Sequence, residues 1–500
     1  MRRFLLLALT ALYLWPIGSY ASADFPHLRI KDRRIVDENG STVILRGVVV
    51  NQLGEYFQAN PDIKPTVELI EKDFQDMAAI GVNAVRLVIT WSTIEPEPDV
   101  YNIEYLERIK QAVEWARNNS IYVILDMHQD AWGMYIATPA DMKCAWPTTH
   151  NVGWDGAPEW ATITDGKNPC MIIHREFSPA VYRAWTSFWT NRNGVRDHLV
   201  NTWAFLAEAF KDDPAVAGYD LLNEPNWGEN ILATVLKHKP DFYADCVKAI
   251  RQAETAGHNK LIFFEPLAIW SAMPGEMPVK FTGDPDIVYA PHIYLGAISI
   301  DMFLFGRELI PLETGFKIAK REAAFHNTTF FNGEYGPSSR DRHGWRYAAL
   351  EDKYQNHSSL WLWKNGCGDP HHMQGKWPRT DYTPDRVMNS VMKIRCDDLQ
   401  NPEGVEAGYK EISKLILSRP YPRAFPSPAV FKSDPDTRSF VIKGESPGGV
   451  PLVVWIPGDG EPAYQGDGLG EVRLEKVHGG WLLHAIPERG PWSLEAKGRD

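Results

Sequence analysis

Short apolar runs and longer segments with helical periodicity alternate along most of this sequence. From Ile103 to Asn118, apolar residues recur every three or four positions, which predicts an amphipathic helix. The run from Val43 to Val50 is apolar almost throughout, as expected of a strand buried on both faces of a parallel sheet. Seven further strand-like runs follow, at 84–90, 121–126, 217–222, 261–265, 287–292, 329–334 and 358–364.

Eight strands separated by helices predict an α/β fold, the (β/α)8 TIM barrel. An open doubly wound sheet is the alternative, but such sheets usually have fewer strands. Nor does a G-x-G-x-x-G motif follow the first predicted strand. One connection, at residues 131–180, is unusually long, and long loops in compact domains are usually functional.

From about Pro420 the pattern changes to short strand-like runs between prolines and turns, such as Ser439 to Ile442 and Trp481 to Ile486. This spacing predicts a small antiparallel β-sandwich at residues 420–500. The sandwich either binds carbohydrate or braces the barrel. The predicted barrel domain then covers residues 24–419.

Residues 1–23 have the features of a secretory signal peptide. Two arginines precede an apolar run from Phe4 to Trp15, and the sequence A-S-A at 21–23 offers a cleavage site. An uncleaved membrane anchor is the alternative, although the run is short for a membrane span. We therefore expect a secreted protein, extracellular or periplasmic.

Secretion permits disulfide bonds among the five cysteines. Cys144 with Cys170 would close one long loop, and Cys367 with Cys396 would close another. Cys246 lies in a helical pattern and is expected to be a free buried thiol.

The net charge of −12 argues against a nucleic-acid partner. No metal site or cofactor is predicted, because no C-x-x-C motif occurs and His371 and His372 are adjacent rather than four residues apart. The 19 tryptophans are more informative, since indole faces stack on sugar rings and hold apolar groups.

Two glutamates stand where predicted strands end. Glu224 lies in L-L-N-E-P-N at 221–226, and Glu334 lies in F-N-G-E-Y-G at 331–336. A glycosidase needs such a pair, because one carboxyl protonates the leaving oxygen while the other attacks or activates water. Barrel enzymes place their sites at these strand ends. The other candidates there are Arg86, His128, Asp130, Asn223, His292, Tyr294 and Trp363.

These motifs resemble glycoside hydrolase family 5, and within it the endoglycoceramidases and related glycolipid glycosidases. The resemblance rests on N-E-P at 223–225, H-x-Y at 292–294 and N-G-E-Y-G at 332–336, with D-M-H-Q-D at 126–130 and W-x-x-x-E-P at 91–96. It covers nearly the whole chain after the leader, and it implies a barrel followed by a β-sandwich.

The resemblance also implies residue roles. Glu224 would be the general acid/base and Glu334 the nucleophile of a retaining mechanism, with Glu224 holding its proton longer. Arg86 and Tyr294 would hydrogen-bond the nucleophile, and Asn223 would reach the sugar 2-hydroxyl. His128, Asp130 and Trp363 would line the sugar subsite.

The expected function is hydrolysis of the bond between sugar and ceramide in glycosphingolipids, by a monomer that contacts a membrane surface transiently. The apolar segment 295–305 would receive the lipid or touch the membrane, or form a short helix packed on the barrel. Segment 48–54 lacks an expected lysine, which leaves glucose-linked and galactose-linked ceramide open. The alternatives are a β-glucanase or mannanase, another lipid β-glucosidase, and a non-catalytic carbohydrate-binding protein.

Overall fold

The computed structural model describes residues 25–56, 66–151, 153–254, 258–336, 341–369, 387–388, 390–395 and 405–500. Its centre is an eight-stranded parallel sheet in the order β10-β11-β4-β5-β6-β7-β8-β9, and a parallel bridge between Tyr289 and Phe330 links its two edges. The (β/α)8 prediction is therefore confirmed. The strands are β4 (Arg46–Val50), β5 (Ala84–Thr90), β6 (Tyr122–His128), β7 (Val216–Asp220), β8 (Leu261–Phe264), β9 (Ile287–Tyr289), β10 (Phe331–Tyr335) and β11 (His357–Leu360).

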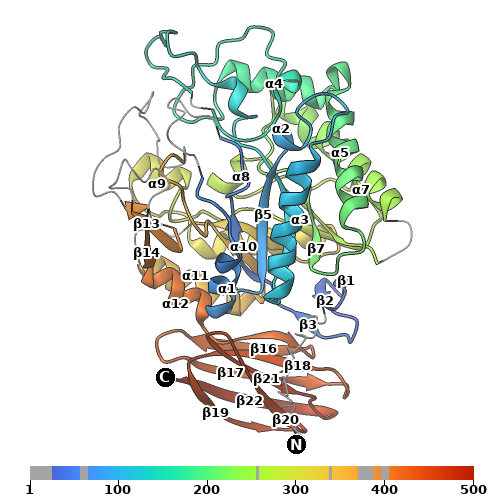
Figure 1. Cartoon of the computed structure of the whole chain (residues 1–500), viewed down its shortest axis with the longest axis vertical. Coiled ribbons are helices and arrows are strands. Elements are labelled where there is room, and N and C mark those ends of the chain that lie inside the picture. Colours follow the sequence, from blue (N-terminus) through green and yellow to red (C-terminus); the bar gives the residue numbers. More distant parts are fainter. Residues whose placement is uncertain are drawn as a thin grey trace, which may run out of the picture.

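Helices follow the strands and cover the barrel (Figure 1). The predicted helix at 103–118 has these bounds, because the Asn102 side chain caps it by accepting the N–H of Tyr105. The helices are α1 (Glu71–Ala79), α2 (Trp91–Ile94), α3 (Ile103–Asn118), α4 (Pro179–Trp189), α5 (Val195–Phe210), α6 (Ile231–Ala233), α7 (Lys239–Ala253), α8 (Ile269–Ala272), α9 (Ile300–Phe305), α10 (Leu312–Phe325), α11 (Asp341–Tyr354) and α12 (Glu411–Ser418). Shorter turns are η1 (Met134–Ile136), η2 (Glu159–Ala161), η3 (Arg192–Gly194) and the π-helical η4 (Thr234–His238).

The C-terminal region forms two antiparallel sheets that lie below the barrel in Figure 1. One sheet has the order β1-β2-β3-β15-β18-β21-β20 and the other β16-β17-β22-β19. Their strands are β1 (Arg29–Lys31), β2 (Arg34–Val36), β3 (Thr42–Val43), β15 (Tyr421–Phe425), β16 (Ala429–Asp434), β17 (Ser439–Ser446), β18 (Leu452–Pro457), β19 (Gly460–Asp467), β20 (Val472–Val477), β21 (Gly480–Ala485) and β22 (Gly490–Arg499). A third sheet comprises β12 (Val387–Met388), β13 (Met392–Arg395) and β14 (Val405–Tyr409).

The larger sandwich sheet includes strands from both ends of the chain. β3 pairs with β15 through Val43 and Ala424, so the N-terminal strands continue a sheet that otherwise belongs to the C-terminal region. The predicted boundary at residue 420 is crossed by this pairing.

Close contacts fix the sandwich to the base of the barrel. Tyr421 Oη donates a hydrogen bond to the carbonyl of Gly81 at 2.7 Å, and Trp455 packs on the same glycine. Gly81 has a positive φ of 84°, and a Cβ there would lie 2.4 Å from Trp455 Nε1, so only glycine fits. The backbone N–H of Ser433, on β16, donates to Asp352 of α11 at 2.8 Å. These contacts support the bracing role.

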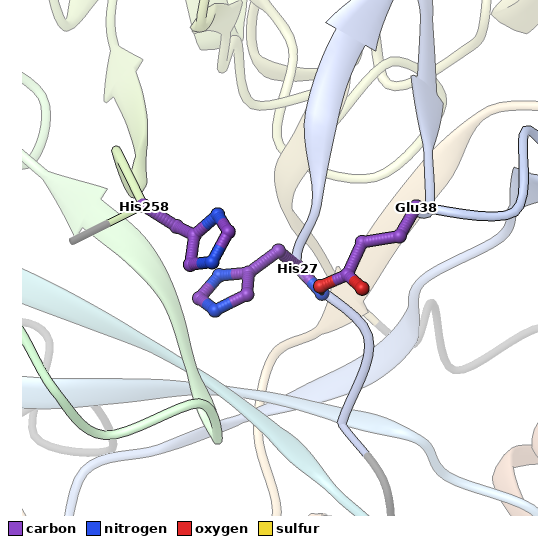
Figure 2. Close-up of side chains that lie close together, drawn as sticks. All are labelled: His27, Glu38 and His258. Atoms are coloured by element: carbon purple, nitrogen blue, oxygen red, sulfur yellow. The ribbon is translucent and has the colours of Figure 1, made fainter.

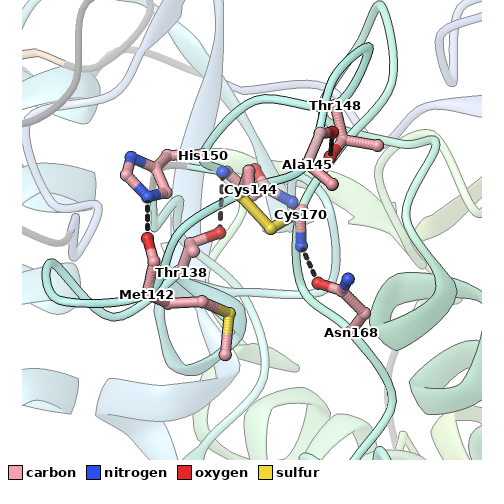
Figure 3. Close-up of a disulfide and its surroundings, with 9 residues drawn as sticks. Thr138, Met142, Cys144, Ala145, Thr148, His150, Asn168 and Cys170 are labelled. Carbon is pink, nitrogen blue, oxygen red and sulfur yellow. Dashed lines mark hydrogen bonds between the residues drawn. A yellow bond between two sulfur atoms is a disulfide. The ribbon is translucent and has the colours of Figure 1, made fainter.

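The insertion at 131–180 forms the loops at the top of Figure 1, away from the sandwich. A disulfide between Cys144 and Cys170 joins two of its segments, as predicted (Figure 3). Cys246 is free and buried, which is also as predicted. Cys367 is disulfide-bonded, but Cys396 lies outside the described residues, and that pairing stays a prediction. Among the described residues, none of the helices has the length and apolar character to cross a membrane.

Candidate active site

Inward-facing positions of three strands change from apolar to charged toward their carboxyl ends. Ala84, Ile124 and Phe263 belong to an apolar cluster inside the barrel. Two residues further along each chain, on the same face, stand Arg86, Asp126 and Glu265. The strand geometry thus places one cation and two carboxylates in a layer above the apolar one.

Arg86 is fully buried and lies at the centre of this layer. Its guanidinium donates to Asp126 at 2.9 Å and to Asp220, Glu265 and Glu334 at 2.8 Å each. The surrounding carboxylates raise its pKa well above the usual value, although burial alone would lower it. Arg86 is therefore a permanent cation that orients four acidic side chains.

Glu334, on β10, has two hydrogen-bond donors. Arg86 Nη1 donates to Oε1 at 2.8 Å, and Tyr294 Oη donates to Oε2 at 2.9 Å. The neighbouring Gly333 allows His292 to approach, because a Cβ at this glycine would lie 2.7 Å from the imidazole Nε2. The predicted contacts of Arg86 and Tyr294 with Glu334 are present.

Glu224 stands four residues after β7 ends and has a positive φ of 37°. Its N–H donates to Glu265 Oε2 at 2.8 Å, while Gln129 Nε2 donates to the carbonyls of Asn223 and Glu224 at 2.6 and 2.9 Å. Such a backbone conformation is costly for a glutamate and persists only where the surroundings hold it. These hydrogen bonds fix the direction of the Glu224 side chain.

Asn223 is hydrogen-bonded at both ends of its amide. Oδ1 accepts from Arg86 Nη2 at 3.0 Å, and Nδ2 donates to the carbonyl of Gln129 at 2.9 Å. One of the two amide hydrogens is left over for a ligand. Its role toward a sugar 2-hydroxyl stays a prediction.

His292 connects the two glutamates. Its Nδ1 lies 2.9 Å from Glu224 Oε1 and 3.5 Å from Glu334 Oε2, and its Nε2 lies 3.3 Å from Glu265 Oε1. One oxygen of Glu224, one of Glu334 and one nitrogen of His292 all lie within 4.8 Å of one another. The two carboxyl groups are thus close enough to act on one bond.

The pKa values of Glu224 and Glu334 do not follow the order expected from the sequence. Burial raises the pKa of Glu224, but the hydrogen bond and charge of His292 outweigh it, and the net pKa is lowered. Burial raises the pKa of Glu334, against the charges of His292 and Arg86, and the net pKa is raised. For His292, the carboxylates of Glu265 and Glu334 outweigh burial and place its pKa well above the usual value. His292 is therefore the group of this cluster that favours holding a proton, and the pKa shifts of the two glutamates run opposite to the predicted order.

A second polar group lies beside this pair. His128 Nδ1 is 2.7 Å from Asp126, and Arg175 donates to Asp130 at 2.5 Å. Asp155 is fully buried and lies with His128 and Asp130 in one cluster. The negative charges of Asp126 and Asp155 outweigh burial and raise the pKa of His128 to about 10. This arrangement offers charged hydrogen-bonding partners for sugar hydroxyls.

Trp363 does not line this group, so that prediction is wrong. Its ring is fully buried, and Nε1 donates to Asp73 of α1 at 3.0 Å. Trp361 takes the predicted place instead, stacked on His128 with ring centroids 5.5 Å apart. The strand β11 ends at Leu360, so the alternation of a strand does not extend to these tryptophans.

A family model described as cellulase (glycosyl hydrolase family 5) matches residues 36–367, about two thirds of the chain. The match includes both glutamates and all of the site residues above. The chain belongs to glycosyl hydrolase family 5.

Two curated proteins that resemble this chain are endoglycoceramidases. Endoglycoceramidase I of Rhodococcus hoagii is 28% identical over 284 residues, which cover 53% of this chain and 52% of the relative. The endoglycoceramidase of Hydra vulgaris is 27% identical over 52% of this chain and 53% of its own. The alignments thus span about half the length of these curated relatives.

Solved structures match over nearly the whole chain. A crystal structure of endogalactoceramidase has 37% sequence identity and a TM-score of 0.84, covering 94% of this chain and 99% of its own. Endo-glycoceramidase II from Rhodococcus sp., in its ganglioside GM3 complex, has 21% identity and a TM-score of 0.69 over 94% and 100% of the two chains. The second likeness shows the shared fold alone.

Several residues of this family 5 site were missed from the sequence. Asp126 interrupts an apolar strand, Asp220 ends one and Glu265 directly follows one, and these positions were an available signal. Asp155 and Arg175 come from the insertion, where no local pattern marks them.

The carboxylates of Glu334 and Asp130 are paired with arginines, which compete with a metal ion for the same oxygens.

Proposed function

We propose that the protein is a retaining β-glycosidase in which Glu334 is the nucleophile and Glu224 the general acid/base. The spacing of the two carboxyl groups carries this proposal, since an oxygen of each lies within 4.8 Å of the other. Retaining enzymes have their carboxyl groups about 5–5.5 Å apart, whereas inverting enzymes need about 6.5–9.5 Å to hold a water molecule between them.

The surroundings of Glu334 suit a nucleophile. Hydrogen bonds from Arg86 and Tyr294 stabilise its carboxylate form and aim one oxygen at the anomeric carbon. Attack forms the bond from Glu334 to the sugar and breaks the bond to the leaving oxygen. A water molecule then releases the sugar with the original anomeric configuration.

Glu224 supplies the proton for the leaving oxygen, and His292 stores it. A shift of one proton from His292 Nδ1 to Glu224 Oε1, along their 2.9 Å contact, gives a neutral imidazole and a protonated acid. When Glu334 becomes esterified it loses its negative charge. Glu224 can then act as the base for the incoming water.

The proposed substrate is a glycosphingolipid, cleaved between the sugar and the ceramide, with galactose linked to the ceramide. The likeness to endogalactoceramidase supports galactose, because its 37% identity extends over nearly both complete chains. The curated endoglycoceramidases match at lower identity over about half their length. Segment 48–54 lacks the lysine expected of a relative that cleaves sugars from sphingolipids, so this segment does not favour either sugar.

We further propose secretion and transient contact with a membrane surface. The Cys144–Cys170 bond supports an oxidising compartment. Loops that follow the barrel strands expose apolar side chains on the same side as the site: Ile298, Leu304, Phe305 and Leu309 near α9, and Trp146, which is 94% exposed, in the insertion. Exposed apolar groups of this kind insert into the interfacial region of a bilayer.

The deciding experiment compares four substrates in detergent: a galactose-linked ceramide glycan, glucosylceramide, a ganglioside and a soluble β-glucan. Release of an intact sugar from the galactose-linked lipid, absent in Glu224→Gln and Glu334→Gln, is the expected result. NMR of the first product should show the original anomer. Cleavage of the glucan alone would contradict the lipid substrate, and the opposite anomer would contradict the retaining mechanism.

A further inference from the structure

A cluster of two histidines and one glutamate lies at the other end of the barrel from the active site. His258 precedes β8, Glu38 lies in the turn between β2 and β3, and His27 precedes β1 (Figure 2). Because the active site follows the carboxyl ends of the strands, a residue that precedes β8 belongs to the opposite face. The cluster therefore has no part in the proposed hydrolysis.

The three side chains are close enough to share a ligand. The imidazole rings of His27 and His258 are stacked, with centroids 3.6 Å apart and 26° between their planes. The backbone N–H of His27 donates to Glu38 Oε1 at 3.1 Å, and this bond holds the carboxylate beside the rings. One possible donor atom from each residue lies within 4.8 Å of the others.

The ammonium of Lys260 donates to the carbonyl of Asp213 and is not bonded to the cluster. The two stacked rings and the carboxylate therefore offer two nitrogens and one oxygen.

We propose that His27, Glu38 and His258 bind one divalent transition-metal ion of the zinc class, with water in the remaining coordination position. Imidazole and carboxylate ligands suit zinc, copper and nickel rather than calcium or magnesium. Zinc–ligand bonds of about 2.0–2.1 Å place tetrahedral donors roughly 3.3 Å apart. The side chains must therefore close by up to about 1.5 Å, and the rings must turn out of the stack. Exposure of Glu38 and His258 allows this movement.

The bound ion would tie the start of the chain to the loop before β8. The same N-terminal segment already contacts the barrel, since Ile30 N–H donates to Asp286 at 2.8 Å and Tyr122 Oη donates to the carbonyl of Pro26 at 2.9 Å. A third link at His27 would stabilise the strands that connect the barrel with the sandwich sheet.

Isothermal titration with zinc chloride tests this site, on full-length protein without a histidine tag, after treatment with a chelator, at pH 7.5. One ion per chain should bind with a Kd on the order of 10 µM. His27→Ala, His258→Ala and Glu38→Gln should each weaken binding at least tenfold, and zinc should raise the Tm of the wild type but not of His258→Ala. His484→Ala, which alters a histidine–glutamate pair on the sandwich, is the matched control and should bind zinc normally.

Two results would overturn the proposal. One is a wild type that binds no zinc at concentrations up to about 1 mM, a hundredfold above the expected Kd. The other is zinc binding of unchanged strength in both histidine variants. Because His258 and Glu38 are exposed, their variants should fold normally, and circular dichroism with glycosidase activity verifies this. Unchanged hydrolysis in His258→Ala is expected whatever the substrate proves to be.

Discussion

Arg86 shows how one residue can determine the arrangement of a whole site. It is bonded to four carboxylates, two of which, Glu265 and Glu334, also face His292. A buried ion cluster of this kind is costly to desolvate and loses its balance when one partner is removed. The role of Arg86 is to position other side chains: it holds Glu334 and Asn223 in place and keeps a positive charge beside Glu334.

Removal of the Tyr294 hydroxyl should weaken the proposed nucleophile, Glu334, without unfolding the protein. Tyr294→Phe deletes a 2.9 Å hydrogen bond to Glu334, and a bond to a charged group contributes about 1.5–3 kcal/mol. A loss of kcat of roughly 10- to 100-fold is expected in steady-state kinetics. Tyr347→Phe is the matched control, because within the described residues the Tyr347 hydroxyl has no hydrogen-bond partner. Equal losses in both variants would contradict the role of Tyr294.

The two neighbouring tryptophans should respond differently to substitution. Trp361→Ala removes a ring beside His128, so kcat/KM should fall roughly tenfold while the Tm changes little. Trp363→Ala empties a buried position and should lower the free energy of unfolding by about 3–5 kcal/mol.

Urea unfolding and kinetics on both variants make the comparison, with Trp363→Phe as a milder change if the alanine variant does not fold. A large loss of stability in Trp361→Ala with unaltered KM and kcat would mean that Trp361 has only a packing role.

At the scale of elements, the site residues come from the ends of the barrel strands and from one insertion. The strands β5, β6, β8 and β10 present Arg86, Asp126, Glu265 and Glu334 in a fixed layer. The insertion adds Asp155 and Arg175, which no strand could place there. Since a long loop has little ordering of its own, its disulfide matters for the position of these two side chains.

Loss of the Cys144–Cys170 bond should destabilise the insertion. The two cysteines are separated by 26 positions in the chain, and closing a loop of this size contributes about 3.5 kcal/mol by the chain-entropy estimate. Cys144→Ser/Cys170→Ser should unfold at lower urea concentration, and proteases should cleave residues 131–180 faster. Each single variant should match the double variant, because either change removes the same bond. Additive effects would show that the thiols contribute separately.

At the scale of the whole molecule, buried histidines should make stability depend on pH in both directions. Burial lowers the pKa of His357 to about 3 and of His326 to about 4, so both are neutral when folded and take up protons on unfolding below pH 6.5. Stability from these groups is present above pH 6.5 and is lost as the pH falls toward 4. His128, with a pKa raised to about 10, acts oppositely and loses its contribution as the pH rises from 6.5 to 10.

The Tm should therefore be highest near pH 6–7, which differential scanning fluorimetry from pH 4 to 10 can measure. His357→Asn retains an acceptor for the N–H of Leu45 and should flatten the acid side of the curve. A wild type with equal Tm at pH 5 and pH 7 would contradict this assignment.

The sequence by itself determined the barrel, the two strand-end glutamates and one disulfide, because these depend on local patterns. Apolar strands, amphipathic helices and motifs around Glu224 and Glu334 are recognisable within ten or twenty residues. It also placed most of the site residues at one face, since carboxyl ends of parallel strands must meet there.

Only the tertiary structure decided which distant groups meet. Arg86 and Glu334 are 248 residues apart. The lowered pKa of Glu224 follows from His292, and the raised pKa of Glu334 follows from burial, rather than from either motif. Trp361, and not the predicted Trp363, stacks on His128. The strand β11 ends at Leu360, directly before Trp361, so strand alternation does not predict where either ring points. The pairing of β3 with β15 likewise joins the two ends of the chain, through hydrogen bonds that no local pattern encodes.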